Sequence, residues 1–247
     1  MRQKTYRTFH DDLVTSRHQD WQLPADYDWR LPGRAWQRRW FRRLAKGISR
    51  LYVHTHAITI KNGWRLTTAG PCVVYGNHTQ PTGDVLLPLY LGATQRFNVL
   101  ASPANLGIPV IGPLTVFGGA VPTPQTLTQM RAFRHAVHQK LAAGEWLMVY
   151  PEEHVWPYYP GIRPFNSGAF HFPIGERVPA YTITVTYRRR WLRHPRQVVY
   201  VDGPFRPDPR LSPKQQQRQL AQMVTACMAK RTATTNVSYV HYEEVSR

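Results

Sequence analysis

Short apolar runs alternate with helical patterns from about residue 56 onward. The runs with the length and the β-branched or aromatic content of strands are 71–77, 96–103, 145–152, 179–188 and 196–204. The segments that instead repeat apolar residues at helical spacing are 84–92, 125–144 and 212–231. Strands that alternate with helices predict an α/β fold in which helices flank a mostly parallel central sheet.

Two of these helices carry clear end signals. Gly144 is expected to end the helix of residues 125–144. Ser212 and Pro213 occupy the N-cap and first-turn positions of the last helix. The expected buried face of the former helix comprises Leu127, Met130, Phe133 or Arg134, Val137 and Leu141.

Residues 34–55 have a different pattern, in which large apolar side chains recur at helical spacing between arginines and lysines. The apolar positions are Trp36, Trp40, Leu44, Ile48 and Leu51. We predict a basic amphipathic helix, which could lie in a lipid interface with its rings at headgroup depth and its cations on anionic lipid. The same apolar stripe would equally allow packing on the core, with a solvated basic face.

The expected organisation is a single domain that follows an N-terminal extension. Residues 1–33 are polar and aromatic and contain Pro24, Pro32 and Gly33, which predicts an irregular arm. The basic helix of residues 34–55 comes next, and residues 56–247, including the last helix, form the domain. Hydrophobic residues make up 42% of the chain, enough to build a sizeable core.

The charge balance indicates an anionic partner. The chain has 32 lysines and arginines against 14 acidic residues, a formal net charge of +18, which suits a nucleic acid, a lipid surface or an acidic carrier protein. Two cysteines far apart fit a reducing compartment. Without a signal-peptide pattern or an apolar run of about 18 residues, we expect a cytoplasmic protein that is peripheral to the membrane.

Charged and polar loops follow two of the expected strands. "GNHTQPTGD" follows one apolar run and "PEEHVWPYYPGIR" follows another. In an open α/β sheet, ligands bind beyond the carboxyl ends of the strands. His78 and Glu152 would both lie at such ends, so the two loops could form the rim of an active site.

Four blocks resemble the glycerolipid acyltransferases of the 1-acyl-sn-glycerol-3-phosphate acyltransferase (PlsC-like) type. They are "YGNHTQPTGDV", "NLGIPVIGPLTVFGGAV", "VYPEEH" followed by "RPFNSGAF", and "ERVPAYTITV". Their order and spacing agree with that family over roughly residues 56 to 205. The resemblance implies an enzyme that moves a fatty acyl group from acyl-CoA or acyl-ACP to a hydroxyl of a lysophosphatidate-like lipid, without a cofactor.

The resemblance also implies roles for individual residues. His78 would be the general base that takes the hydroxyl proton, and Asp84 would fix the tautomer of its ring. Backbone N–H groups near Gly83 would stabilise the oxyanion. The expected substrate contacts are Asn77, Gly83, Glu152, Glu153, His154 and Arg163. Glu152 could bind the acceptor, order the two loops or form an ordinary salt bridge.

The sequence departs from the family pattern near the acceptor. Five residues separate His78 from Asp84, where the family has four. The family's Gly-Thr-Arg after the glutamate is replaced by Glu153, His154 and Val155, and its cations in the second block are missing. Arg163 could supply a relocated phosphate clamp. Alternatively, the acceptor is a phosphate-free lipid or sugar hydroxyl.

Three other interpretations compete with this one. A basic protein that binds nucleic acid or membranes without catalysis would suit the charge, although the sequence has no helix-turn-helix, zinc-finger or RNP motif. A metal hydrolase could use His78, Asp84, Glu152 and His154, yet their spacing matches no metal motif. Asp84 could simply cap the helix that follows it. We expect no bound metal and no nucleic-acid partner.

Overall fold

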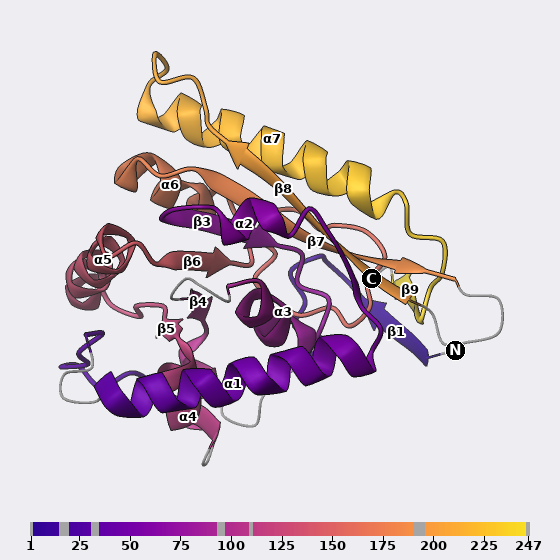
Figure 1. Ribbon diagram of the computed structural model, residues 1–247. Coiled ribbons are helices and arrows are strands. Elements are labelled where there is room, and N and C mark those ends of the chain that lie inside the picture. The colour runs from indigo at the N-terminus through magenta and orange to yellow at the C-terminus, as the bar shows by residue number, and fades with distance from the viewer. Residues whose placement is uncertain are drawn as a thin grey trace.

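The computed structural model of the protein describes residues 2–14, 20–30, 35–92, 97–108, 111–189 and 196–245. Its centre is a seven-stranded sheet with the order β2-β8-β7-β3-β6-β4-β5 (Figure 1). The strands are β2 (Thr59–Lys61), β3 (Cys72–Gly76), β4 (Phe97–Ala101), β5 (Ala120–Pro122), β6 (Trp146–Val149), β7 (Ala180–Arg188) and β8 (Arg196–Phe205). Neighbouring strands pair in parallel except β7 with β8, which confirms the α/β fold with a mostly parallel sheet.

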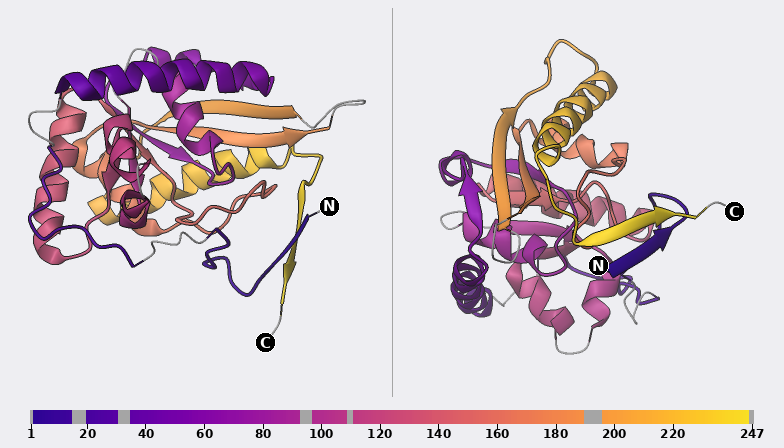
Figure 2. Two further views of the ribbon diagram at one scale, coloured as in Figure 1. Left: turned by 90° about the horizontal axis from the view of Figure 1, so that it is seen from below. Right: turned by 90° about the vertical axis from the view of Figure 1, so that its right-hand side faces the viewer.

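Helices cover both faces of the sheet. One face carries α1 (Ala35–Thr55), α2 (Trp64–Thr67) and α3 (Gly83–Leu91), and the other carries α5 (Leu127–Ala142), α6 (His171–Glu176) and α7 (Pro213–Thr232). The view from below in Figure 2 shows α1 and α7 on opposite sides of the strands. The remaining helical segments are η1 (Pro103–Gly107), α4 (Ile111–Gly118), which contacts α1, and η2 (Ser167–Phe170).

The alternation of side chains along β3 explains the two layers. Cys72 and Val74 point into the core with α1, α2 and α3, whereas Val73 and Tyr75 point into the core with α5 and α7. A strand that is buried on both faces needs a continuous apolar run, and this is the pattern seen in the sequence.

Helix α5 buries a narrower face than the sequence predicted. Leu127 is 90% exposed and Met130 is also exposed, while the buried apolar residues are Phe133, Ala136, Val137 and Leu141. Gln129 takes the buried position in the first turn, because its side-chain amide donates a hydrogen bond to the carbonyl of Pro24. The two expected core residues lie in this first turn, away from the sheet.

The prediction of an irregular arm over residues 1–33 is wrong for Arg2–Tyr6. These residues form β1, which pairs in parallel with β9 (Val240–Glu244) in a separate two-stranded sheet. Figure 2 shows the two strands side by side. A strand whose partner lies at the other end of the sequence leaves no local sign of its pairing. The other described residues of the arm form turns and irregular backbone, with Leu23 and Trp29 buried in the core.

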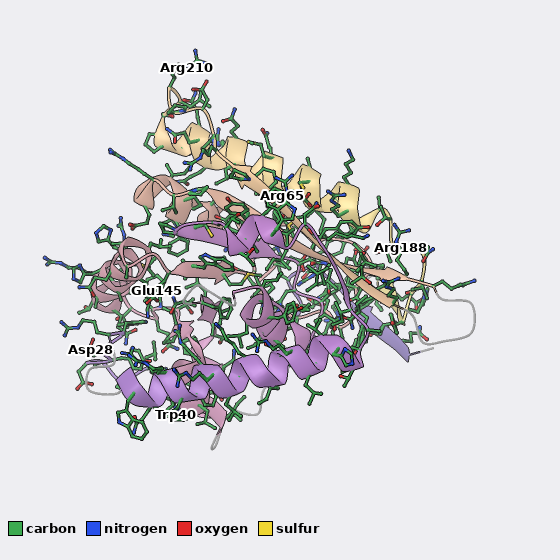
Figure 3. All side chains as sticks on the ribbon, viewed as in Figure 1. Asp28, Trp40, Arg65, Glu145, Arg188 and Arg210 are labelled. Atoms are coloured by element: carbon green, nitrogen blue, oxygen red, sulfur yellow. The ribbon has the colours of Figure 1, made fainter. Side chains whose placement is uncertain are left out.

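Helix α1 packs on the core through a face other than its large apolar stripe. Its buried residues are Ala45, Ser49 and Val53. The stripe is solvent-exposed: Trp36 is 64% exposed, Trp40 63%, Leu44 62%, Ile48 49% and Leu51 63%. Figure 3 labels Trp40 on the outer side of the helix. No helix in the described ranges is long and apolar enough to cross a membrane.

Candidate active site

The two polar loops leave adjacent strands at the same edge of the sheet. Strands β3 and β6 pair in parallel, so the loop that contains His78 and the loop that begins at Pro151 start side by side. Two backbone hydrogen bonds join the loops, from the N–H of Trp156 to the carbonyl of His78 (3.0 Å) and from the N–H of Tyr158 to the carbonyl of Thr79 (2.8 Å). The two loops therefore lie side by side at one edge of the sheet, as the sequence predicted.

His78 and Asp84 contact each other directly. Nδ1 of His78 lies 2.7 Å from Oδ2 of Asp84, and the same oxygen accepts the backbone N–H of Gln80 at 3.0 Å. The N-cap of α3 is Thr82, so Asp84 lies inside the first turn and its carboxylate does not cap the helix. The extra residue between His78 and Asp84 is accommodated by the turn before the helix, without loss of the contact.

The contact fixes the state of the imidazole. An ionised carboxylate can only accept hydrogen bonds, so Nδ1 of His78 carries the proton and Nε2 is left as the basic nitrogen. Asp84 is buried, and this burial raises the pKa of its carboxyl group, while the hydrogen bond from His78 opposes the rise. The side chain of His78 is 19% exposed, so its ring remains open to a reactant.

Tyr150 contacts both His78 and Asp84, and the sequence pattern did not predict a role for it. Its ring stacks on the His78 imidazole with 4.4 Å between centroids, and its hydroxyl donates to the backbone carbonyl of Asp84. Tyr150 directly follows β6 and is the first polar residue after that apolar run. Its place at a strand end, like that of the histidine loop after β3, was the available signal.

Asn77 precedes His78 in the chain, and its side chain hydrogen-bonds to strand β7. Its side-chain amide donates to the carbonyl of Val185 at 2.9 Å, and its Oδ1 accepts the N–H of Val185 at 2.8 Å. Asn77 is 1% exposed, so both of its polar groups are used in extending the β3–β7 contact. This position does not support the expected role in substrate binding.

Gly83 begins α3 in a crowded turn. A Cβ atom at this position would lie 2.9 Å from the Tyr52 hydroxyl of α1 and 2.9 Å from Cβ of Gln80. Glycine is thus required by close packing between α1 and the turn that positions Asp84. The N–H groups of Asp84, Val85 and Leu86 donate to the carbonyls of Gln80 and Thr82, so the N–H of Gly83 is left as the expected oxyanion donor.

Glu152 and Arg163 form a buried ion pair. Nη2 of Arg163 lies 3.0 Å from Oε2 of Glu152, and the side chains of both residues are fully buried. Oε1 of Glu152 accepts the N–H of Arg163, and Oε2 accepts the N–H of His78 at 3.2 Å. Burial raises the pKa of Glu152 and lowers the pKa of Arg163, and the attraction between the two charges opposes both shifts. Of the three roles expected for Glu152, the geometry supports two: it forms a salt bridge with Arg163 of its own loop, and it orders the two loops.

Arg163 is also engaged elsewhere, so it is not available to an acceptor phosphate. Nη1 donates to the carbonyl of Phe9 at 3.1 Å, and the guanidinium lies 4.8 Å from the ring centroid of Trp156. Its Nη2 donates in addition to the carbonyl of His154. The structure therefore does not support the relocated clamp.

Glu153 and His154 interact with different partners. Glu153 accepts a hydrogen bond from the side-chain amide of Asn166, and Nδ1 of His154 lies 3.7 Å from Oδ2 of Asp12. Glu153 has a positive φ of 66°, so the chain turns sharply after Glu152. No group of three or more histidine, cysteine, aspartate or glutamate side chains with metal-binding geometry occurs within the described ranges.

Comparison with known proteins supports the chemistry suggested by this geometry. The acyltransferase family model matches residues 57–186, just over half of the chain. Curated protein sequences give no match. Among solved structures, the crystal structure of the 1-acyl-sn-glycerophosphate (LPA) acyltransferase PlsC from Thermotoga maritima is similar, with a TM-score of 0.57 and 16% sequence identity over 81% of this chain and 84% of that chain. At this identity the likeness shows the fold, and the family match shows the rest: the chain belongs to the acyltransferase family and is an acyltransferase enzyme.

Proposed function

We propose that this enzyme transfers a fatty acyl group from a thioester to a hydroxyl of a lysophosphatidate-like lipid, with His78 as the general base. The observation that carries the proposal is the 2.7 Å contact between Nδ1 of His78 and Oδ2 of Asp84. It holds the ring in the tautomer that leaves Nε2 free to accept a proton. Among the described residues, no hydrogen bond to Nε2 of His78 occupies that nitrogen.

The transfer proceeds by addition and elimination. Nε2 of His78 takes the proton of the acceptor hydroxyl while its oxygen attacks the thioester carbonyl carbon. The backbone N–H of Gly83 stabilises the oxyanion, and Asp84 stabilises the imidazolium. The oxyanion then collapses, the C–S bond breaks, and His78 returns the proton to the leaving thiolate. The products are an ester and a free thiol.

The acceptor is proposed on two grounds. The similar PlsC structure is described as a 1-acyl-sn-glycerophosphate acyltransferase, and the net charge of +18 favours an anionic lipid. A phosphate-free lipid or sugar hydroxyl is the second candidate, because the cation expected to bind the phosphate is held in the buried pair with Glu152. The donor is acyl-CoA or acyl-ACP.

The membrane surface is proposed as the place of the reaction. The exposed apolar stripe of α1 includes Trp36 and Trp40, and the exposed side chains of Arg39, Arg43 and Arg50 lie on the same helix. The Arg43 guanidinium lies 5.6 Å from the ring centroid of Trp40. Aromatic rings with flanking cations suit the headgroup region of an anionic bilayer.

The proposed function is tested by an acylation assay with purified protein. Labelled acyl-CoA and acyl-ACP are offered with lysophosphatidate or monoacylglycerol, and the products are identified by mass. We expect phosphatidate (diacylglycerol phosphate) as the product of the wild type with lysophosphatidate, and a loss on the order of 10²–10⁴-fold in folded His78→Ala. Wild-type turnover by His78→Ala refutes the mechanism, and exclusive use of monoacylglycerol identifies the phosphate-free acceptor.

A further inference from the structure

The small β1–β9 sheet lies against the loop that carries Glu152. Tyr6 of β1 and Tyr242 of β9 both contact Trp156 of that loop, with ring centroids 4.7 and 5.2 Å away. The Tyr242 ring is stacked on Trp156 with only 9° between the planes, and its hydroxyl donates to the carbonyl of Pro157 at 2.7 Å. The two strands therefore hold the loop from outside the seven-stranded sheet.

Trp156 is the centre of this contact. It is 0% exposed, and its indole N–H donates to the carbonyl of Asp11 at 2.9 Å. Phe9 and Tyr159 pack against it as well, at centroid distances of 5.8 and 5.4 Å. The indole is thus fixed by side chains and backbone from both ends of the sequence.

The same loop holds the backbone of His78 on both sides. The N–H of His78 donates to Oε2 of Glu152 at 3.2 Å, and the carbonyl of His78 accepts the N–H of Trp156 at 3.0 Å. A displacement of the loop would therefore displace both peptide groups that flank the base. General-base catalysis is sensitive to such a displacement, because a shift of about 1 Å can cost about 100-fold in rate.

Arg163 contacts both Glu152 and Trp156, the two residues that hydrogen-bond to the backbone of His78. It pairs with Glu152, stacks on Trp156 and donates to the carbonyl of Phe9. Each of these contacts is buried or partly buried, so a displacement of the loop would also disturb the ion pair and the contact with the N-terminal segment. Residues 2–12 and 240–244 lie outside the part of the chain that the family model matches, residues 57–186.

We propose that Trp156 and its β1–β9 partners are positioning residues that set the geometry of His78. This inference rests on the proposed acyl transfer. It assigns a role in the reaction to the two strands at the ends of the sequence, neither of which touches the reacting atoms.

The test compares two buried tryptophans. In Trp156→Phe the indole donor to Asp11 is lost. The matched control is Trp29→Phe, since Trp29 is 4% exposed, donates its indole N–H to the carbonyl of Pro122 at 2.8 Å, and packs in the core with α5. We expect a fall in kcat of about 10- to 100-fold for Trp156→Phe with KM little changed, and wild-type kcat for Trp29→Phe.

A second pair of variants keeps the tryptophan. Tyr242→Ala removes the stacked ring of β9, and Tyr27→Ala removes the ring that packs edge-on against Trp29 at 4.9 Å. We expect Tyr242→Ala to lower kcat and Tyr27→Ala to leave it unchanged. This pair decides the matter if Trp156→Phe does not fold.

A measurement without substrate separates this inference from the proposed function. The ring C–H resonance of His78 is followed by NMR at one pH and identified by its absence in His78→Gln. We expect its chemical shift to move in Trp156→Phe and Tyr242→Ala and to stay in place in the Trp29 and Tyr27 controls. An unchanged chemical shift together with unchanged kcat overturns the positioning role. A wild-type protein without acyl transfer refutes the proposed function, and the chemical shifts then decide the inference alone.

Discussion

The ring of Tyr150 lies nearly parallel to the imidazole of His78, with 4.4 Å between the centroids and 19° between the planes. The hydroxyl of the same tyrosine donates to the backbone carbonyl of Asp84. One side chain directly after β6 therefore contacts both His78 and Asp84. Burial raises the pKa of Tyr150 well above its usual value, so the hydroxyl keeps its proton and remains a donor at neutral pH.

Two substitutions of Tyr150 should separate stacking from hydrogen bonding. Tyr150→Phe keeps the stacked ring and loses the donor to Asp84, and we expect a loss of unfolding free energy of about 1 kcal/mol with most of the activity retained. Tyr150→Ala removes the ring that limits the motion of the imidazole, and we expect kcat to fall about 10- to 100-fold. Equal kinetics in the two variants would show that the stack has no role.

Asp84→Asn should lower the rate without lowering stability at neutral pH. Burial raises the pKa of Asp84. A carboxyl group whose pKa is higher in the folded than in the unfolded protein stabilises the fold in its protonated form. This stabilisation is complete below the unfolded pKa of about 4 and is lost as the pH rises through the folded pKa. At pH 7 the wild type therefore carries a buried carboxylate that the neutral amide avoids. We expect kcat to fall on the order of 10²–10⁴-fold, because an amide neither fixes the tautomer nor stabilises the imidazolium.

The control for this prediction is the pH dependence of unfolding. Urea titrations at several pH values should show Asp84→Asn at least as stable as the wild type at pH 7, with the advantage gone near pH 4. Marked destabilisation of Asp84→Asn at pH 7 with unchanged kcat would show that the residue has a purely structural role.

Much of the sheet could be predicted because each strand carries its own signal. The run of residues 71–77 is apolar and is buried on both faces, and this burial is a local property of the sequence. Strand β1 carries no such signal, since its side chains are partly or fully exposed where described and its partner is β9. The pairing of β1 with β9 depends on where the fold places these two strands.

The candidate site also has a part that could be predicted and a part that could not. His78 and Asp84 could be predicted from the block pattern of the sequence, and the turn between them brings their side chains into contact. The fate of Arg163 could not, because its position in the sequence is equally compatible with a surface arginine and with a buried partner of Glu152. Its burial depends on Trp156, which lies seven positions earlier in the same loop, and on Phe9 of the N-terminal segment.

Asn77→Ala should destabilise the protein more than it affects substrate binding. It would leave the N–H and the carbonyl of Val185 without their partners in a buried place. Each unsatisfied backbone group costs about 1–3 kcal/mol. We expect a lower urea midpoint with an unchanged slope and an unchanged KM for the acceptor in the folded fraction. A raised KM at wild-type stability would restore Asn77 to the substrate-binding residues.

The exposed stripe of α1 should control binding to anionic vesicles. In Leu44→Glu a 62% exposed leucine becomes a charge that anionic lipid repels. Burial of a leucine side chain is worth about 1.5–3 kcal/mol, so we expect at least a tenfold loss in co-sedimentation. Leu127→Glu is the matched control, because Leu127 is 90% exposed on α5, a helix of the opposite face of the sheet.

Salt provides a second check of the same surface. Each basic residue near an anionic bilayer contributes about 1 kcal/mol, and salt screens this attraction. Wild-type binding to anionic vesicles should therefore weaken as salt is added, and binding to neutral vesicles should be weaker from the start. Equal binding of wild type and Leu44→Glu would rule out the α1 stripe as the contact surface.

Arg163→Met tests whether this arginine binds an acceptor phosphate or supports the loop. The substitution leaves the carboxylate of Glu152 buried without its partner, which typically costs about 3–5 kcal/mol. We expect the double variant Glu152→Gln/Arg163→Met to be more stable than Arg163→Met, because it removes the unpaired charge. Since burial already raises the pKa of Glu152, the loss in Arg163→Met should shrink on acidification as that carboxylate takes up a proton.

The control is Arg210→Met, which breaks an exposed pair with Asp208 and should change the urea midpoint little. The relative KM for lysophosphatidate and monoacylglycerol should be the same in wild type and Arg163→Met. A selective rise in the KM for lysophosphatidate at wild-type stability would show instead that Arg163 binds the phosphate.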